Sequence, residues 1–345
     1  MSEPNASSAV NHQIVLHSRP VGEPKTTDFA LQTAPVPALG EGEVLRRTLY
    51  LSLDPYMRGR MSSGPSYAAS TGLGHVMGGG TVSLVIASYN PNYQEGDFVL
   101  GYDGWQEYGV SEGKELHKLE PHQAPLSYAL GVLGMPGLTA YAALLEIGKP
   151  KPGETVVVSA AAGAVGSIVG QIAKIKGCRA VGMAGSEEKC RFVTETLGFD
   201  ACINYKQGDL AAALKEACPN GIDIYYDNVA GPILEAVLGQ INLHARIPLV
   251  GLISQYNATT PPPGPNLVSL LIKRSLIQGF LVSDYGHMQP QFLQEMGQWL
   301  RKGKVRYRED VVEGLENAPE AFLGLFSGQN TGKLLVRVSD DPTLK

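Results

Sequence analysis

The sequence predicts an α/β protein in which a β-rich domain is joined to a doubly wound parallel sheet. From residue 155 to residue 252, short β-branched runs alternate with helix-length amphipathic segments, as is typical of parallel strands covered by helices. Residues 1 to about 130 differ, because Gly, Pro and short β-type runs follow one another without a convincing long helix. This pattern indicates a small barrel or sandwich. A length of 345 residues is sufficient for two cores.

The N-terminal part is expected to contain five strands, each a β-type run bounded by turn residues. They are residues 13–17, 43–51, 80–86, 98–102 and 105–110. Residues 129–145 then show a helical apolar face that is interrupted at Pro136-Gly137. We interpret this segment as the entry into the second domain.

Residues 155–184 contain the arrangement around which the second domain is built. Residues 155–159 are predicted to be a strand, 160–166 a turn of small residues, 167–176 a helix and 178–184 a second strand. Strand, glycine turn, helix and strand within about 30 residues form the βαβ unit of a Rossmann dinucleotide-binding domain.

The turn reads A-x-x-G-x-x-G, with Ala160 at the position of the first glycine in the usual G-x-G-x-x-G motif. Such a motif also occurs where a helix merely packs closely on a strand, but the order of the elements around it favours a nucleotide site. We expect the backbone of this turn to bind a pyrophosphate at the helix N-terminus. The residues concerned are Ala162, Gly163, Ala164, Val165 and Gly166.

The segment after the second strand is expected to select the cofactor, and it favours NADPH over NADH. In NAD sites an Asp or Glu about 20 residues beyond the glycine motif binds the ribose 2′-hydroxyl. Here Gly185 and Ser186 are followed by Glu187, Glu188 and Lys189, so a hydroxyl and an ammonium are available for a 2′-phosphate. Two alternatives stay open: Ser186 only caps the next helix, or Glu187 is the acid of an NAD site.

The rest of the chain continues the alternation and ends in a further strand. The predicted helices are residues 187–197, 209–217, 233–243, 290–302 and 318–326, with a helical stretch from residue 268. The predicted strands are residues 201–205, 222–228, 246–252, 277–282, 304–310 and 333–338. Residues 257–265 form a proline-rich loop.

Composition argues against several classes of protein. With 28 basic and 33 acidic residues the net charge is −5, so we expect no binding to nucleic acid or to a membrane surface. No run of 18 apolar residues predicts a membrane span, and the polar residues 1–13 predict no secretory signal. The spacing of Cys178, Cys190, Cys202 and Cys218 fits neither a zinc ribbon nor a disulfide framework. We therefore expect reduced thiols in a cytoplasmic protein.

Catalytic zinc is not expected, although Gly74-His75 is similar to the start of the Gly-His-Glu zinc motif of alcohol dehydrogenases. Val76 replaces the glutamate, and no cysteine precedes Cys178. A catalytic zinc ion needs three protein ligands, which His75 alone cannot supply. We therefore predict a reaction without a metal, in which hydrogen-bond donors stabilise any developing oxyanion.

Three tyrosines in predicted loops are the candidate donors. Tyr56 follows Asp54-Pro55, Tyr67 follows Pro65-Ser66, and Tyr256 follows Ser254-Gln255. Each has a hydroxyl that can donate to a substrate oxygen. The alternative for each is aromatic packing with a polar tip.

Six separated motifs, in one order along the chain, point to a known family. They are residues 51–59, 134–141, 161–166, 227–229, 254–257 with 261–265, and 328–333. Over nearly its whole length the chain resembles the zinc-independent medium-chain dehydrogenase/reductases of the alkenal/one oxidoreductase branch, which includes prostaglandin reductases, leukotriene dehydrogenases and plant double-bond reductases. Residues 101–106 are most similar to those of the bacterial NADPH-dependent curcumin reductases.

The resemblance implies how the chain divides and where the cofactor binds. It implies a GroES-like domain of residues 1–132 with a C-terminal return of residues 301–345, a Rossmann NADP-binding domain of residues 133–300, and a homodimer. At the adenosine phosphate end it implies contacts from Lys189, Tyr205 and Asn330. At the nicotinamide end it implies Thr139, Asn228, Phe280 and Val282, with Tyr256 at the substrate carbonyl. Ala230 departs from the family, where a glycine is common.

The resemblance also implies a reaction on a small-molecule enone. NADPH would reduce the carbon–carbon double bond of an α,β-unsaturated ketone or aldehyde of the curcumin type, by hydride transfer to the β-carbon. Tyr256 and the nicotinamide ribose 2′-hydroxyl would hold the enolate, and Tyr56 and Tyr67 would line the substrate pocket. Alternatives are a 15-oxoprostaglandin, 2-alkenal or quinone reductase, or a non-catalytic NADPH-binding redox sensor.

Overall fold

The computed structural model describes residues 10–64 and 66–344, which fall into two compact units. Unit 1 consists of residues 10–130, 310–329 and 334–344, and unit 2 of residues 131–309 and 330–333. The first predicted boundary, after residue 132, lies close to the observed change after residue 130, whereas the second, after residue 300, precedes the observed change after residue 309. Residues 1–9 of the polar N-terminal segment, and Pro65, lie outside the described residues.

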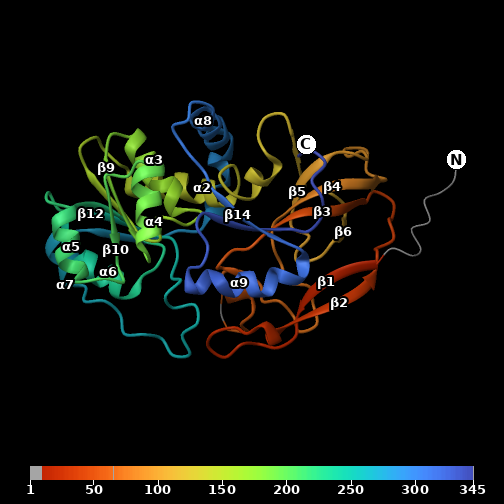
Figure 1. Cartoon of the computed structure of the whole chain (residues 1–345), viewed down its shortest axis with the longest axis horizontal. Helices are drawn as coiled ribbons and strands as arrows, with labels where there is room; N and C mark the ends of the chain where they lie inside the picture. The colour runs from red at the N-terminus through yellow and green to blue at the C-terminus, as the bar shows by residue number, and fades with distance from the viewer. Residues whose placement is uncertain (1–9, 65, 345) are drawn as a thin grey trace. The chain divides into compact units, whose positions relative to one another are not determined.

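Unit 1 is built on a seven-stranded sheet with the order β14-β15-β3-β4-β5-β7, to which β6 adds by pairing with β3. Its strands are β3 (Val44–Ser52), β4 (Thr81–Ser88), β5 (Phe98–Gly101), β6 (Tyr108–Ser111), β7 (His117–Leu119), β14 (Glu309–Glu313) and β15 (Lys333–Arg337). A separate antiparallel pair is formed by β1 (Val10–Leu16) and β2 (Phe29–Pro35). The predicted β-rich domain is confirmed (Figure 1).

The core of unit 1 explains why one predicted strand was misplaced. The Trp105 ring is fully buried, stacks on Phe29 at 5.5 Å between centroids and meets Phe322 edge-on at 5.6 Å. Phe322 lies on α9 (Ala318–Ser327), which therefore covers this core. The prediction of a strand from Trp105 was wrong, because β6 begins only at Tyr108.

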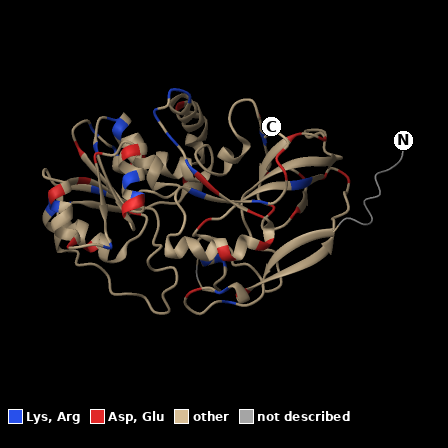
Figure 2. Ribbon diagram, viewed as in Figure 1, with Lys and Arg blue, Asp and Glu red and all other residues tan. Residues whose placement is uncertain are grey.

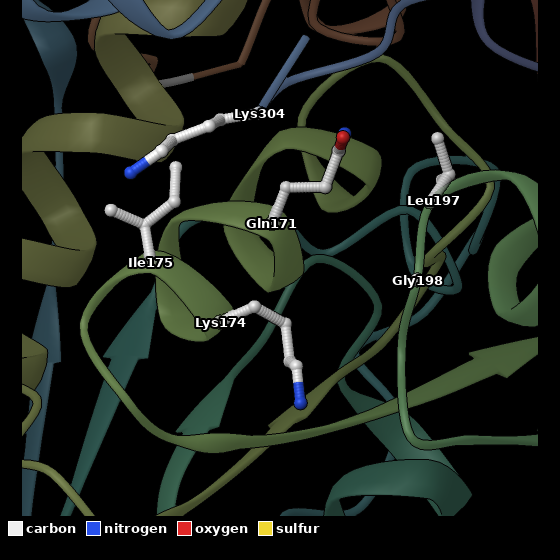
Figure 3. Close-up of a pocket in the computed structure, with 6 residues that line it drawn as sticks. All are labelled: Gln171, Lys174, Ile175, Leu197, Gly198 and Lys304. Atoms are coloured by element: carbon white, nitrogen blue, oxygen red, sulfur yellow. The ribbon is translucent and has the colours of Figure 1, made fainter. Parts of the chain in front are cut away.

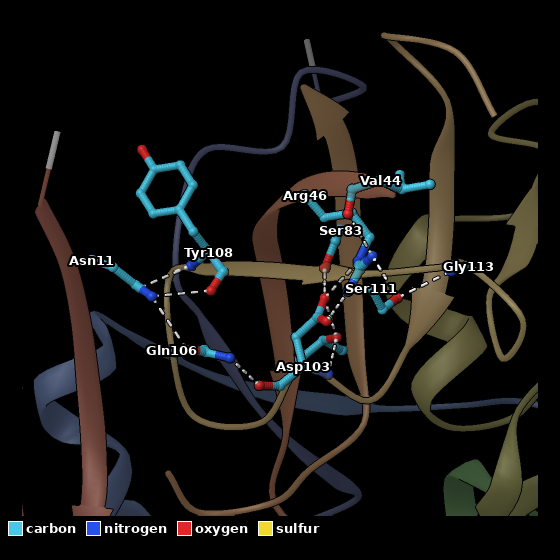
Figure 4. Close-up of polar contacts among 10 residues, drawn as sticks. Asn11, Val44, Arg46, Ser83, Asp103, Gln106, Tyr108, Ser111 and Gly113 are labelled. Atoms are coloured by element: carbon cyan, nitrogen blue, oxygen red, sulfur yellow. Dashed lines mark hydrogen bonds and ion pairs between the residues drawn. The ribbon is translucent and has the colours of Figure 1, made fainter. Parts of the chain in front are cut away.

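A buried ion pair lies among the strands of unit 1 (Figure 4). The Arg46 guanidinium binds both carboxylate oxygens of Asp103, with Nε 3.0 Å from Oδ2, and the exposed fractions of the two side chains are only 2% and 7%. Arg46 Nη1 also donates to the Val44 carbonyl at 2.9 Å and to Ser111 Oγ at 3.0 Å. Ser83 Oγ donates to Asp103 at 3.3 Å. The pair is thus hydrogen-bonded from several strands.

Unit 2 is the predicted doubly wound parallel sheet, with the strand order β10-β9-β8-β11-β12-β13 (Figure 1). The strands are β8 (Thr155–Val158), β9 (Arg179–Ala184), β10 (Ala201–Asn204), β11 (Ile222–Tyr226), β12 (Ile241–Leu249) and β13 (Leu276–Gly279), and each neighbouring pair is parallel. Its α-helices are α2 (Met135–Ala142), α3 (Gly166–Ile175), α4 (Glu187–Arg191), α5 (Leu210–Ala217), α6 (Gly231–Leu238), α7 (Val268–Lys273) and α8 (Gln289–Arg301).

Two boundaries predicted in or next to unit 2 were wrong, one at the end of a helix and one at the start of a strand. The helix predicted to reach residue 243 ends at Leu238, and Ile241 already belongs to β12, where it pairs with Ile222. The strand predicted at residues 304–310 is absent before Glu309, because the Arg306 amide donates to Gln171 Oε1 at 2.7 Å. The Gln171 side chain thus accepts the backbone hydrogen bond that a neighbouring strand would otherwise accept.

Charged residues of both signs are interspersed along the elements of each unit (Figure 2). Among the described residues, none of the helices combines the length and the apolar character that a membrane span needs.

Candidate cofactor and substrate site

The candidate site of unit 2 lies where the strand order reverses. β8 has β9 on one side and β11 on the other, so the chain crosses the sheet in opposite directions from this point. In open α/β sheets, ligands bind at the carboxyl ends of the strands next to such a switch point. After β8 comes Ser159, and after β11 comes Asn228, whose amide donates to Ser159 Oγ at 2.9 Å and whose Nδ2 donates to the Ser159 carbonyl at 2.8 Å.

The turn from β8 into α3 has the conformation that the glycine motif predicts. Ala160 adopts a φ of 51° at the position of the first glycine. A Cβ atom on Gly166 would lie 2.4 Å from the Ala160 carbonyl oxygen, so only glycine allows α3 to begin this close to the strand. The predicted phosphate residues, 162 to 166, thus occupy the turn and the N-terminus of α3.

Asn330 is brought to the same turn from far along the sequence. The Gly332 amide donates to the Ala162 carbonyl at 2.7 Å, and Gly163 and Gly332 form an isolated parallel bridge. Asn330 Nδ2 donates to the Gly332 carbonyl at 2.8 Å. The structure therefore places Asn330 near the predicted phosphate turn.

The residues predicted to select the cofactor gather at the ends of β9 and β10. Ser186 Oγ accepts from the Lys189 amide at 3.3 Å, so Ser186 does cap α4. The Glu187 carboxylate accepts from Asn204 at 3.1 Å. A Cβ atom on Gly185 would lie 3.0 Å from the Tyr205 hydroxyl, which places that ring beside the Gly185 backbone.

Candidates for the nicotinamide end come from the segment after β13 and from α2. Phe280 comes directly after β13, is 6% exposed and stacks on Tyr285 at 4.7 Å, and Val282 opens the next 3-10 turn. Thr139 lies on α2 and is buried, with its carbonyl accepting from the Tyr226 hydroxyl at 2.8 Å.

Tyr256 lies in the segment that follows β12. Its hydroxyl accepts a hydrogen bond from the Leu252 amide at 3.3 Å. Burial raises the pKa of Tyr256, and the Leu252 amide opposes this by a smaller amount. The phenol therefore keeps its proton at neutral pH and can donate it to an acceptor.

The other two candidate tyrosines belong to unit 1 and share one electrostatic cluster. The pKa of Tyr56 is raised, first by burial and then by the Asp54 carboxylate, with smaller effects from Tyr102 and Tyr67 and an opposing effect from Arg60. The Arg60 guanidinium lies 5.3 Å from the centre of the Tyr56 ring. Sequence reasoning missed Tyr102, although it lies within the motif of residues 101–106.

Asp227 lies within the motif of residues 227–229 but was not predicted as a site residue. It directly follows β11, which ends at Tyr226, and is itself fully buried. Its Oδ1 accepts from the Tyr225 hydroxyl at 2.8 Å and from the Val229 and Ala230 amides at 2.9 and 2.8 Å. An aspartate directly after an apolar strand at a switch point is the sequence signal that could have drawn attention to it.

His75 is an exposed residue of unit 1 whose Nδ1 lies 3.1 Å from the Leu73 carbonyl oxygen. In residues 10–64 and 66–344, no group of three or more His, Cys, Asp or Glu side chains is arranged to hold a metal ion. All four cysteines are free thiols.

A cavity of about 330 Å³ lies on unit 2 away from the candidate site (Figure 3). Its lining includes Lys174 and Ile175, from the end of α3, and Leu197-Gly198, which precede β10. These segments lie at the amino edge of the parallel strands. The cavity therefore lies at the opposite edge of the sheet from the candidate site, whose residues follow the carboxyl ends of the strands.

The chain matches two family models, described as the N-terminal domain of oxidoreductase over residues 12–119 and as zinc-binding dehydrogenase over residues 164–300. It is 55% identical over 337 residues to a protein of Escherichia coli named NADPH-dependent curcumin reductase, covering 96% of this chain and 98% of that one. The chain belongs to the medium-chain dehydrogenase/reductase family.

Within the medium-chain dehydrogenase/reductases, the chain falls in the zinc-independent alkenal/one oxidoreductase branch. It is 46% identical to a protein of Nicotiana tabacum named 2-alkenal reductase (NADP(+)-dependent), covering 97% and 99% of the two chains. The structure of CurA from Vibrio vulnificus in complex with NADPH is 54% identical with a TM-score of 0.92, and the match covers 96% and 100% of the chains. The predicted family and fold are thus confirmed.

The backbone conformation of Ala230 has a measurable cost. Ala230 has φ 61° and ψ −152°, a region that is essentially restricted to glycine and costs about 1–3 kcal/mol for other residues. We expect Ala230→Gly to raise the free energy of unfolding by about 1 kcal/mol, after the greater freedom of glycine in the unfolded chain is subtracted. Denaturant unfolding of both proteins measures this difference.

The control for Ala230→Gly is the same change in a helix. Ala212→Gly, at an exposed position of α5, should lower the free energy of unfolding by about 1 kcal/mol. Equal destabilisation by both variants would show that the Ala230 backbone is not strained.

Proposed function

We propose that the protein reduces the carbon–carbon double bond of α,β-unsaturated ketones and aldehydes with NADPH, with curcumin-type enones as substrates. The observation that carries the proposal is the position of Asn228, Tyr256 and Phe280 after three neighbouring strands of the parallel sheet, β11, β12 and β13. This arrangement occurs in a chain 55% identical to an NADPH-dependent curcumin reductase.

The residues present fit a dinucleotide with a 2′-phosphate. The turn of residues 162–166 offers small side chains and a helix N-terminus to the pyrophosphate. Ser186, Lys189 and Tyr205 offer two hydroxyls and an ammonium, which suit the 2′-phosphate. Lys189 would act by its charge while Ser186 also caps α4. When bound, NADPH supplies the hydride.

Tyr256 would act on the substrate oxygen. When the β-carbon of an enone accepts a hydride, negative charge develops on the carbonyl oxygen as an enolate. The protonated Tyr256 hydroxyl would donate a hydrogen bond to that oxygen, and the bond would strengthen as the charge develops. Tyr56 and Tyr67, with Tyr102, would form walls that select the substrate.

The test of this function is NADPH consumption, followed by absorbance, across a panel of acceptors. We expect turnover with curcumin and simple alkenones, and saturated products by mass spectrometry. Preference for a 15-oxoprostaglandin or a 2-alkenal would show that the same reaction has a different substrate. Turnover with quinones alone would indicate a quinone reductase, and cofactor binding without turnover would indicate a redox sensor.

Cofactor selection by Lys189 gives a separate prediction. Losing one hydrogen bond to a charged group costs about 1.5–3 kcal/mol, so Lys189→Ala should weaken NADPH binding roughly ten- to a hundredfold. Binding of NADH, which lacks the 2′-phosphate, should change little. Titration of both cofactors by fluorescence measures this. If NADPH affinity is unchanged in Lys189→Ala, then Lys189 is only a helix residue.

We also propose that the protein is a homodimer formed through the edge of the unit 2 sheet. β13 is the edge strand, and all four of its residues are exposed. The adjoining segment carries exposed apolar side chains, namely Leu267, Val268, Leu271 and Ile272, with exposed fractions of 55–79%. Such an edge and patch favour pairing with a second copy.

Analytical ultracentrifugation tests the dimer. Leu271→Lys puts a charge in the middle of the apolar patch and should produce monomers. Val21→Lys, at another highly exposed apolar residue but in unit 1, should leave the dimer intact. A monomeric wild-type protein would refute the proposed assembly.

We propose the cytoplasm as the cellular location. The basis is the free state of all four cysteines, which suits a reducing compartment. Cell fractionation with an antibody to the protein would test it.

A further inference from the structure

The buried Asp227 carboxylate organises the turn that follows β11. Four donors converge on its Oδ1: the Tyr225 hydroxyl, the Val229 and Ala230 amides, and Ser159 Oγ at 3.3 Å. Oδ2 is buried, and no residue in the described part of the chain bonds to it. One carboxylate oxygen therefore carries all of these contacts.

The turn depends on those contacts because its backbone is unfavourable by itself. Ala230 has a φ of 61° and a ψ of −152°, and Gly231 follows with a φ of 60°. A residue stays in such a conformation only where its surroundings fix it. The two amides that Asp227 accepts from, those of Val229 and Ala230, lie within this strained stretch.

The other side of the turn holds the segment that carries Tyr256. The Asp227 carbonyl accepts from the Val250 and Gly251 amides at 2.8 and 3.1 Å. The Val229 carbonyl accepts from Ser254 Oγ at 2.5 Å and from the Ser254 amide at 3.3 Å. The turn after β11 is thus hydrogen-bonded to the segment after β12, two residues before Tyr256.

We infer that Asp227 is a positioning residue, whose carboxylate fixes the turn that aligns both Asn228 and the segment of residues 250–256. This inference rests on the proposed function, in which Asn228 meets the nicotinamide and Tyr256 the substrate oxygen. Asp227 itself touches neither. The Asp227 side chain fixes the conformation of the turn. The Val229 carbonyl in that turn accepts hydrogen bonds from Ser254, and these fix the backbone that leads to Tyr256.

Two substitutions at Asp227 separate its acceptor oxygen from its charge. Asp227→Asn keeps an oxygen at the position that the two amides need and removes the charge. Asp227→Ala leaves the Tyr225 hydroxyl and both amides without this acceptor, whereas Ser159 Oγ keeps the Tyr226 carbonyl at 3.4 Å. We expect kcat to fall less than about fivefold in Asp227→Asn and more than about tenfold in Asp227→Ala. Rescue by asparagine is what a role through the acceptor oxygen requires.

Ser254→Ala tests the same series of hydrogen bonds at an exposed residue, whose replacement should not prevent folding. Loss of one neutral hydrogen bond corresponds to a fall in kcat of about two- to tenfold. The affinity for NADPH should stay within about twofold. Ser88→Ala removes a comparable bond, from Ser88 Oγ to the Asn90 carbonyl at 3.1 Å in unit 1, and should leave kcat unchanged.

A double-mutant cycle decides whether these residues act through Tyr256. If they do, Ser254→Ala lowers kcat in the wild-type background and has no further effect in the Tyr256→Phe background. A merely structural role would lower kcat by the same factor in both backgrounds, and that additive result would overturn the inference.

Hydrogen exchange of residues 250–256, measured by mass spectrometry, gives a result that does not depend on catalysis. We expect faster exchange in Asp227→Ala and Ser254→Ala, and near-normal exchange in Asp227→Asn. Unchanged exchange in Asp227→Ala would overturn the inference. If Asp227→Ala does not fold, the Ser254→Ala exchange and the cycle decide. If Tyr256→Phe keeps full kcat, the proposed role of Tyr256 fails, and the exchange data alone decide whether Asp227 positions this segment.

Discussion

Replacing Asp103 by alanine should lower the free energy of unfolding by about 3–5 kcal/mol. The substitution leaves the Arg46 guanidinium, whose side chain is 2% exposed, without its carboxylate partner inside unit 1. A buried charge without a partner is costly, because neither water nor an acceptor replaces the lost oxygen atoms. Denaturant unfolding, followed by the fluorescence of the buried Trp105, measures the change.

An exposed ion pair provides the control for Asp103→Ala. The side chains of Arg337 and Glu313 are 35% and 63% exposed, so Glu313→Ala should cost no more than about 1 kcal/mol. If Asp103→Ala lowers the free energy of unfolding as little as Glu313→Ala does, burial does not determine how much the Arg46–Asp103 pair contributes to stability.

The Tyr256→Phe substitution should lower kcat roughly ten- to a hundredfold and change KM less. A hydrogen bond to the enolate oxygen matters most in the transition state, so its loss appears mainly in kcat. Removing one oxyanion donor raises the activation free energy by about 2.7–4 kcal/mol. We expect a smaller increase here, because the ribose 2′-hydroxyl is proposed as a second donor that remains. Steady-state kinetics with one enone and saturating NADPH give both constants.

The matched controls are Tyr56→Phe and Tyr67→Phe, which also remove only a hydroxyl. As wall residues they should act through KM and substrate preference. Full kcat in Tyr256→Phe, together with a collapse in either control, would move the catalytic assignment to that tyrosine. Full activity in all three variants would mean that the tyrosines pack against the substrate without stabilising charge.

Local sequence patterns were sufficient to predict the parallel sheet. Residues 155–184 contain strand, turn, helix and strand with little dependence on distant contacts, and the structure has β8, α3 and β9 there. The strands β2 and β7 were not predicted. β2 is mostly exposed and ends in a proline, and β7 has only three residues, so neither shows a clear apolar pattern.

The contacts that define the candidate site were harder to predict, because they join distant parts of the chain. Asp227 and Ser159 are 68 residues apart in sequence, and Asn228 and Ser159 are 69 apart. The local spacing of apolar residues contains no information about such a pairing. Ala230 was recognised as unusual from the family pattern, but its backbone conformation became evident only in the structure.

Unit 1 is assembled from segments that precede and follow unit 2 in the sequence, and this constrains how the protein folds during synthesis. β3 pairs with β15, as Leu51 does with Val336, and the Trp105 ring packs against Phe322. Domains usually fold in order as they leave the ribosome, N-terminal first. Here the first 130 residues emerge without the strand and helix that complete their core, while nearly all of unit 2 is translated before that strand and helix. The nascent N-terminal segment therefore keeps apolar surface uncovered until residues 315–337 have been translated, and we expect it to need chaperones until then.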